Sequence, residues 1–233
     1  MKKIVSLLAV LFAAISLNGA DTTSVGVDAG YNNNYIVNGV SVAKDSGYAG
    51  LNAFKSLKYA DVYAGTVLVA DGSNDQSHWL FGAGKNLYTI KDFTARADAS
   101  VQRHQTSSIG IVNSTEFGVK LSVPNKWVTP YVRGAFNVEL EQNGYFFGAE
   151  RAQKLLWGTV VTPSVEWGKS TSYEAYNVKA TLTRPVTFAW GTVTPYAEVG
   201  LYNNNVFDNG PKVYALTRFD NDVVYSAGLK LSF

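Results

Sequence analysis

The chain has 233 residues, of which 46% are hydrophobic, 13% aromatic and only 16% charged, and its formal net charge is +2. Soluble domains usually carry about 25% charged residues, so this composition favours a protein that exposes apolar side chains to lipid. Because the sequence has no cysteine, a disulfide framework, a thiolate metal site and a lipoprotein cysteine are excluded.

The first twenty residues have the features of a secretory signal peptide. Lys2 and Lys3 form a positive start, residues 4–15 are apolar but too few to span a bilayer comfortably, and small residues end at Gly19 and Ala20. We predict a leader over 1–20 and a single β-barrel domain over 21–233, with an uncleaved anchor or a buried helix as the alternatives. Without the leader, 18 basic residues face 18 acidic ones, so no basic surplus indicates nucleic acid.

After the leader, apolar and polar residues alternate in stretches of nine to eleven residues, long enough for tilted strands to cross a bilayer. At the end of the chain, Tyr225, Ala227, Leu229, Leu231 and Phe233 share one face. No segment has eighteen consecutive apolar residues, so a transmembrane helix is not expected. In chain order, the expected strands are 24–34, 47–57, 59–70, 78–89, 92–104, 112–123, 127–140, 144–156, 158–168, 173–183, 192–203 and 223–233.

This pattern predicts an all-β fold: an antiparallel up-and-down transmembrane β-barrel of twelve strands, with ten or fourteen strands as alternatives. The count depends most on 144–156, which can also be read as a short helix on a loop. A soluble antiparallel sandwich also alternates, but its strands are usually five or six residues long.

A near-repeat places a tryptophan just before a Val-Thr-Pro tripeptide three times. Val128, Val161 and Val193 begin the tripeptides and lie 33 and 32 positions apart, about the length of two strands and their connections. We predict that all three segments begin strands that run in the same direction from one rim.

The topology follows if both chain ends face the periplasm. The periplasmic connections should be short, and the outer ones longer. The expected periplasmic connections are 56–58, 89–91, 124–126 and 184–191, and the expected outer loops are 32–46, 71–77, 105–111 and 204–222.

The segment Tyr35–Ser41, which reads YIVNGVS, is followed by Gly47-Tyr48 and by Tyr63-Ala64-Gly65. Together they resemble a family of uncharacterised proteobacterial outer-membrane proteins with a Tyr-x-Phe-Arg-Gly-x-Ser-like segment, although Asn38 stands in place of the arginine and Val37 in place of the aromatic residue. The last strand is similar to the C-terminal signature that outer-membrane barrels present to the barrel-assembly machinery. Both resemblances imply insertion in the outer membrane; neither supplies a substrate.

The polar faces of the strands should line the lumen, and tryptophans near strand ends, with Phe233, should lie at the membrane interfaces. The candidate lumen residues are Arg96, Asp98, Glu116, Lys120, Arg133, Glu139, Glu166, Lys179, Glu198 and Lys230, and the interface aromatics are Trp79, Trp127, Trp157, Trp167, Trp190 and Phe233. Five charges of each sign argue against strong selectivity. Lumen tyrosines at 131, 196 and 202 either bind a ring or a sugar, or only pack.

The only two histidines, His78 and His104, are equidistant from Lys91 and should face each other near the outer rim if residues 78–104 form a hairpin. Asp71, Asp75, Ser77, Ser107 and Ser108 lie near them in the sequence, so a base or a metal site is conceivable; two solvated loop-end histidines are the commoner case. No motif supports a nucleophile, a metal or a cofactor. We predict no catalytic, cofactor-binding or metal residue and no enzyme.

The sequence therefore favours a monomeric outer-membrane barrel that acts as a narrow, weakly selective channel for small solutes. Its partners would be lipid, the assembly machinery and the solutes. Twelve strands lie between the eight that side chains can fill and the sixteen that leave an open channel. The alternative is a non-conducting structural, adhesion or receptor barrel that works through its outer loops, and an outer-membrane hydrolase is a third, weaker reading.

Overall fold

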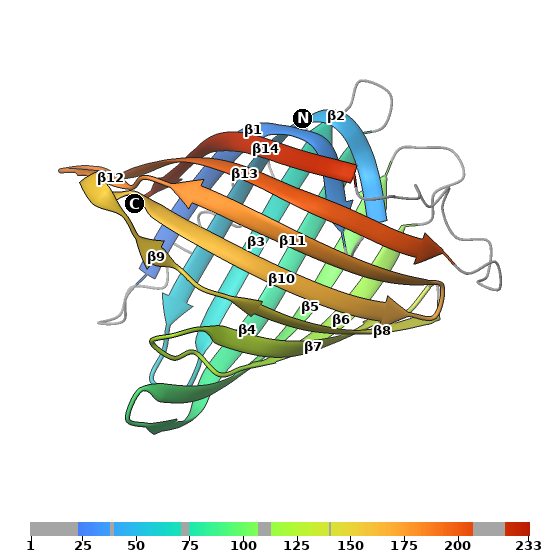
Figure 1. Ribbon diagram of the computed structural model, residues 1–233, viewed down its shortest axis with the longest axis horizontal. Helices are drawn as coiled ribbons and strands as arrows, with labels where there is room; N and C mark the ends of the chain where they lie inside the picture. Colours follow the sequence, from blue (N-terminus) through green and yellow to red (C-terminus); the bar gives the residue numbers. More distant parts are fainter. Residues whose placement is uncertain (1–22, 38–39, 71–74, 107–112, 140, 207–221) are drawn as a thin grey trace.

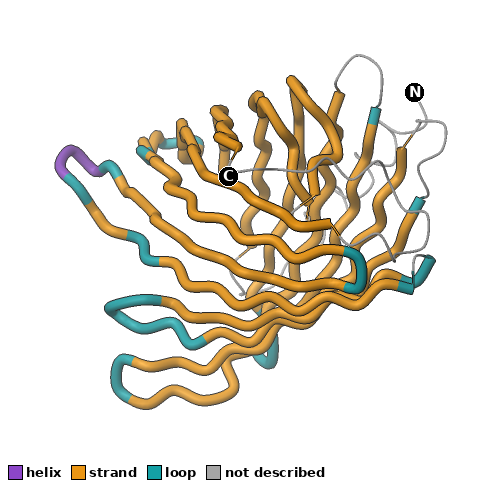
Figure 2. Tube along the Cα trace, turned by 45° about the vertical axis from the view of Figure 1, so that its right-hand side comes forward, coloured by secondary structure: helices purple, strands orange, loops and turns teal. Residues whose placement is uncertain are grey.

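The protein is described by a computed structural model that covers residues 23–37, 40–70, 75–106, 113–139, 141–206 and 222–233. The expected leader, 1–20, lies outside these residues. The long strands are β1 (Thr23–Val37), β2 (Val40–Ser56), β3 (Asp61–Ala70), β4 (Gln76–Ile90), β5 (Phe93–Thr106), β6 (Ser114–Ser122), β7 (Thr129–Asn137), β8 (Gln142–Glu150), β10 (Val160–Ser170), β11 (Tyr173–Thr183), β13 (Gly191–Val206) and β14 (Asp222–Ser232). Two short strands, β9 (Gln153–Lys154) and β12 (Val186–Phe188), and a 3-10 turn, η1 (Leu156–Gly158), lie in connections (Figure 2).

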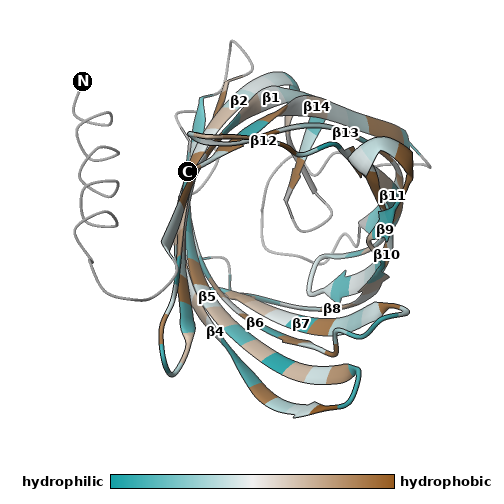
Figure 3. Cartoon of the chain, turned by 90° about the vertical axis from the view of Figure 1, so that its left-hand side faces the viewer, coloured by the Kyte–Doolittle hydropathy of each residue, from teal (hydrophilic) through white to brown (hydrophobic). Residues whose placement is uncertain are grey.

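The twelve long strands form one antiparallel sheet that closes on itself (Figures 1 and 3). Each strand pairs with its neighbour in the chain, and β1 pairs with β14 from Gly26↔Ser232 to Asn32↔Ser226. Val25 and Phe233 exchange backbone hydrogen bonds of 2.9 and 3.3 Å beyond that register. The prediction of a closed twelve-stranded barrel, with the last strand pairing near Val25, is confirmed. We call the end with Thr23 and Phe233 the terminal rim and the other the distal rim.

The uncertain segment 144–156 forms a wall strand only as far as Glu150; its remainder contains the short strand β9 and the first residue of the 3-10 turn. Strand β8 pairs with both β7 and β10, so it is part of the barrel wall. The chain then leaves the wall through β9 and η1, where Trp157 has a positive φ of 57°. Among the described residues, no helix is both long and apolar enough to cross a membrane.

The outer face of the barrel is apolar over its middle. Valines at 119, 178 and 199 and Leu229 each expose about half of their surface, between 52% and 55%. The residues between them along each strand point inward and are mostly small, polar or charged. The closed ladder pairs the backbone groups of neighbouring strands, and the alternation of side chains gives the barrel an apolar outer surface.

The three Val-Thr-Pro segments lie at the terminal rim, and β7, β10 and β13 run in the same direction, as predicted. Their prolines explain where the neighbouring strands end. The carbonyls of Pro130, Pro163 and Pro195 accept bonds from Val123, Arg151 and Arg184 at 3.0–3.1 Å. Because proline has no N–H to return the bond, the ladder stops there: β6, β8 and β11 each end at the residue just before that donor.

The expected connections are confirmed only in part. A long outer loop over 32–46 is wrong, because β1 and β2 continue as a paired ribbon to Val37 and Val40, with register irregularity after Tyr35. The connection after β8 is longer than a terminal-rim turn was expected to be, since it contains β9 and η1. Residues 71–74, 107–112 and 207–221, which include Asp71, Ser107 and Ser108, lie outside the described residues.

A charge on the outer face should destabilise this barrel far more than the same charge one residue away. Val178 points outward near the middle of β11, whereas Asn177 points inward beside it. We expect Val178→Arg to lower the free energy of unfolding by about 2–4 kcal/mol in lipid vesicles, and Asn177→Arg by much less. Equal losses in urea unfolding of the two variants would contradict the assignment of faces.

Candidate lumen lining

The lumen face carries a chain of paired charges that begins on β3. The Arg96 guanidinium lies 2.7 Å from an Asp61 carboxylate oxygen and 2.9 Å from one of Asp98. Asp61 also accepts a hydrogen bond from Ser56 at 2.8 Å. One cation is thus held between two carboxylates, with 18–23% of each side chain exposed.

A second group of paired charges lies on β7, β8 and β10. Arg133 donates to both carboxylate oxygens of Glu166, at 3.0 and 2.9 Å, and the Tyr131 hydroxyl donates to Glu166 at 2.9 Å. The Arg133 guanidinium also lies 3.7 Å from the centre of the Phe146 ring. This fork geometry is the strong form of an arginine–carboxylate pair, because two parallel bonds fix both groups.

The remaining lumen cations lie on β6, β11 and β14. Lys179 lies 3.1 Å from Glu198, which also accepts a bond from Thr181 at 2.7 Å. The ammonium group of Lys120 lies 4.2 Å from the centre of the Tyr131 ring, and that of Lys230 lies 5.0 Å from the centre of the Tyr196 ring. Both lysines therefore face an aromatic ring, the negative face of which attracts a cation.

Glycines on the lumen face make room for these rings. Tyr131 lies directly across from Gly148, Phe146 from Gly168 and Tyr196 from Gly228. A Cβ atom built on any of the three glycines would overlap or crowd the opposite ring. The ring therefore lies against the backbone of the next strand, and a cation lies over it. Three such stacks of glycine, ring and cation end in Lys120, Arg133 and Lys230.

Nine of the ten predicted lumen residues lie on inward-facing positions of the strands; Glu139 does not. Strand alternation also places Asp28, Asp61, Glu150 and Asp222 on the lumen face. Alternation in the sequence predicts a lumen position for Asp28, which lies between Val27 and Ala29. Asp61 and Glu150 stand at strand ends, where alternation does not predict which face a side chain takes. The inward carboxylates of the described strands are those of Asp28, Asp61, Asp98, Glu116, Glu150, Glu166, Glu198 and Asp222, and the inward cations are Arg96, Lys120, Arg133, Lys179 and Lys230.

Glu139 was expected in the lumen and lies instead at the distal rim, because β7 ends at Asn137. It binds Arg103 and Thr115, which share the outer face with Phe117. Partial desolvation acts to raise its pKa, but bonds from the Thr115 and Glu139 backbone N–H groups, the Thr115 hydroxyl and Arg103 hold the pKa of the carboxyl at about 2. Glu139 is therefore a charged turn residue that ties β7 to β5 and β6.

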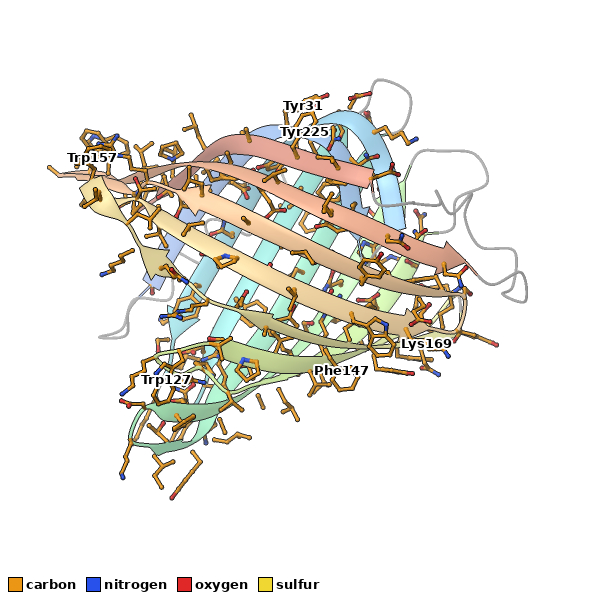
Figure 4. The ribbon with its side chains drawn as sticks, viewed as in Figure 1. Tyr31, Trp127, Phe147, Trp157, Lys169 and Tyr225 are labelled. Atoms are coloured by element: carbon orange, nitrogen blue, oxygen red, sulfur yellow. The ribbon has the colours of Figure 1, made fainter. Side chains whose placement is uncertain are left out.

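The predicted interface aromatics form two bands. Trp127, Trp157, Trp190 and Phe233 lie at the terminal rim and are 51–84% exposed, and Figure 4 shows Trp127 and Trp157 at that end. Trp167 lies toward the distal rim, where its ring packs with Tyr145 and Phe147 and its indole N–H donates to Glu174 at 2.8 Å. Trp79, on the outer face of β4, belongs to the same distal band. Their contact with lipid stays a prediction.

The two histidines pair directly across the β4–β5 hairpin, as predicted. Their Nδ1 atoms are in hydrogen-bond contact, the Tyr35 ring lies against His78, and both Nε2 atoms are buried without a partner among the described residues. They are thus packed side chains and not solvated loop ends. The described residues contain no group of three or more histidine, aspartate or glutamate side chains placed to hold a metal ion.

Comparisons with known proteins identify the fold. The chain is similar to the solved structure of the KdgM porin, with a TM-score of 0.54 and 13% identity over 90% of this chain and 99% of that one. A second KdgM structure, in complex with disordered oligogalacturonate, matches with a TM-score of 0.53, 12% identity and the same coverage. No protein-family model and no curated protein matches the sequence. This is the fold of a porin; the resemblance of residues 35–65 to an uncharacterised family stays a prediction.

The Arg133–Glu166 pair should couple strongly, because the two side chains are only 23% and 16% exposed. We expect Arg133→Met or Glu166→Gln alone to cost about 2 kcal/mol of unfolding free energy, since each leaves a partner unpaired. The double variant should cost about 1–3 kcal/mol less than the sum of the two. The exposed pair of Lys126 and Asp92 at the terminal rim is the control, with an expected coupling of about 0.5 kcal/mol. Equal coupling in urea unfolding of both pairs would contradict this account.

Proposed function

We propose that the chain is an outer-membrane channel that passes small hydrophilic solutes through its lumen with weak selectivity. The observation that carries the proposal is the state of the lumen charges. The side chains of the Arg96, Arg133 and Lys179 pairs keep 16–35% of their surface exposed, although they lie inside a closed barrel. Charges in a dry interior are costly, so this exposure supports a water-filled lumen.

The rings over the glycines support a passage for the same reason. Tyrosine and phenylalanine side chains that project toward the barrel axis would narrow a twelve-stranded lumen. At Gly148, Gly168 and Gly228 the rings lie against the wall instead. Side-chain bulk is thereby kept close to the strands, where it narrows the lumen least.

The location is part of the proposal. The leader-like residues 1–20 and the terminal strand are the features expected of a chain that is exported and inserted by the barrel-assembly machinery. The terminal rim, with its prolines and short turns, would face the periplasm, as in other bacterial barrels. We expect a monomer, since the closed sheet leaves no strand edge to pair.

The likeness to the KdgM porin does not extend to its ligand in this proposal. Oligogalacturonate is a polyanion, and a site for it needs cations that no carboxylate neutralises. In this lumen, Arg96, Arg133 and Lys179 bind carboxylates at 2.7–3.1 Å. We therefore propose small solutes of no fixed identity and not acidic oligosaccharides.

Buried aromatic side chains favour one second candidate. Phe146 and Tyr173 are only 2% and 6% exposed on the lumen side, which is also what a plugged barrel would show. The second candidate is thus a non-conducting structural, adhesion or receptor barrel that works through its outer loops.

Single-channel recording in planar bilayers separates the two candidates. We expect the purified, heat-modifiable protein to give discrete conductance steps, with uptake of uncharged sugars into vesicles falling as sugar size increases. A folded protein with no conductance at any voltage or salt concentration would contradict the channel proposal and favour the second candidate.

The glycine stacks give a sharper test. Gly148→Ala places a methyl group where the Tyr131 ring lies, so the ring must move inward. We expect the unit conductance to fall measurably. Gly134→Ala is the matched control, because Gly134 lies on the outer face of β7 and a Cβ there meets only one backbone oxygen, at 3.9 Å. Unchanged conductance in a folded Gly148→Ala protein would show that this ring does not border the passage.

A further inference from the structure

We propose that the lumen prefers cations to anions, so the channel favours small inorganic cations and amine-bearing solutes. This inference rests on the proposed function. The sequence alone predicts five charges of each sign, but with Glu139 outside the lumen and four further carboxylates inside it, eight carboxylates face five cations. The formal charge of the described lumen face is therefore −3.

The arrangement of the charges adds to their count. Every cation on the described lumen face lies beside a carboxylate or over an aromatic ring. Arg96 lies between two carboxylates and Lys179 beside one, while Lys120 and Lys230 lie over Tyr131 and Tyr196. A cation held in this way has little attraction left for a passing anion, because the partner already stabilises its charge.

Two carboxylates in the terminal half of the described lumen face lie outside these ion pairs. Among the described residues, Asp28 and Glu150 form no ion pair within 4.0 Å. Asp28 lies across from Lys230 on β14, but the Lys230 ammonium lies over Tyr196. Glu150 lies across from Thr129 and Ser164, near the terminal rim. These two carboxylates are available to a hydrated cation in the terminal half of the lumen.

A negative electrostatic potential in the lumen, worth about half kT per unit charge, is enough to produce a measurable preference for cations. It raises the local cation concentration and lowers that of chloride by the same factor, so the permeability ratio of potassium to chloride is about three. Because salt screens the wall charges over about 10 Å at 0.1 M, the preference should weaken as the salt concentration increases.

The test is the reversal potential of the reconstituted full chain in a KCl gradient. We expect a potassium-to-chloride permeability ratio of about three for the natural sequence and a clearly lower ratio, nearer to one, for the double variant Asp28→Asn, Glu150→Gln. Glu174→Gln is the matched control, because the Glu174 carboxylate lies on the outer face of β11. The side-chain amide oxygen of the glutamine can still accept the hydrogen bond from Trp167. The control should keep the natural ratio.

The outcomes are distinct. Conductance with a ratio of one or less overturns the cation preference and leaves the channel proposal standing. A ratio above one that the double variant does not lower shows that Asp28 and Glu150 are not its source, and also overturns the inference. A folded barrel without conductance overturns the channel proposal and this inference with it.

Discussion

Closure of the sheet by β1 and β14 is the constraint on which the rest of this structure depends. In hydrocarbon, an unpaired backbone N–H or C=O group costs several kcal/mol, so a strand that leaves one edge open to lipid is not viable. Here the first and last described strands pair from Gly26↔Ser232 to Asn32↔Ser226. Once they pair, no edge remains, and every side chain must point either to the apolar outside or into the enclosed lumen.

Closure of the sheet then constrains the side chains that point into the lumen. Charges and rings from twelve strands converge on a confined space, where an unpaired charge is costly and bulk closes the passage. Several carboxylates pair with guanidinium or ammonium groups: Asp61 with Arg96 across β4, Glu166 with Arg133 across β8, and Glu198 with Lys179 on the adjacent strand. The rings lie over glycines of the next strand. Both arrangements keep the side chains at the wall. The carboxylates in excess over the cations are the charges with which a solute in the lumen can interact.

The alternation of residues predicted nearly all of the fold, because a strand between lipid and water must change polarity at every residue. It succeeded for Tyr225 to Phe233 and for the strands around Lys120, Arg133 and Lys179. It failed where that constraint ends. Glu139 stands an even number of residues after Arg133, as a lumen residue of β7 would, but β7 stops two residues before it. Beyond the end of a strand, the alternation no longer predicts which way a side chain points. Strands β1 and β2 likewise extend as a ribbon, of mixed polar and apolar residues, over a range that the sequence pattern assigns to a loop.

The sequence by itself determined the fold class, the number of strands, the closing pair and the rim marked by the three prolines, since each depends on local polarity or on a missing N–H group. Only the tertiary structure decided which charges meet. Arg133 and Glu166 are 33 positions apart, and Asp61 and Arg96 are 35. Register and barrel closure bring them together, and no local pattern specifies that distance. The same holds for Tyr131 over Gly148: one ring and one glycine become a stack only when two strands align.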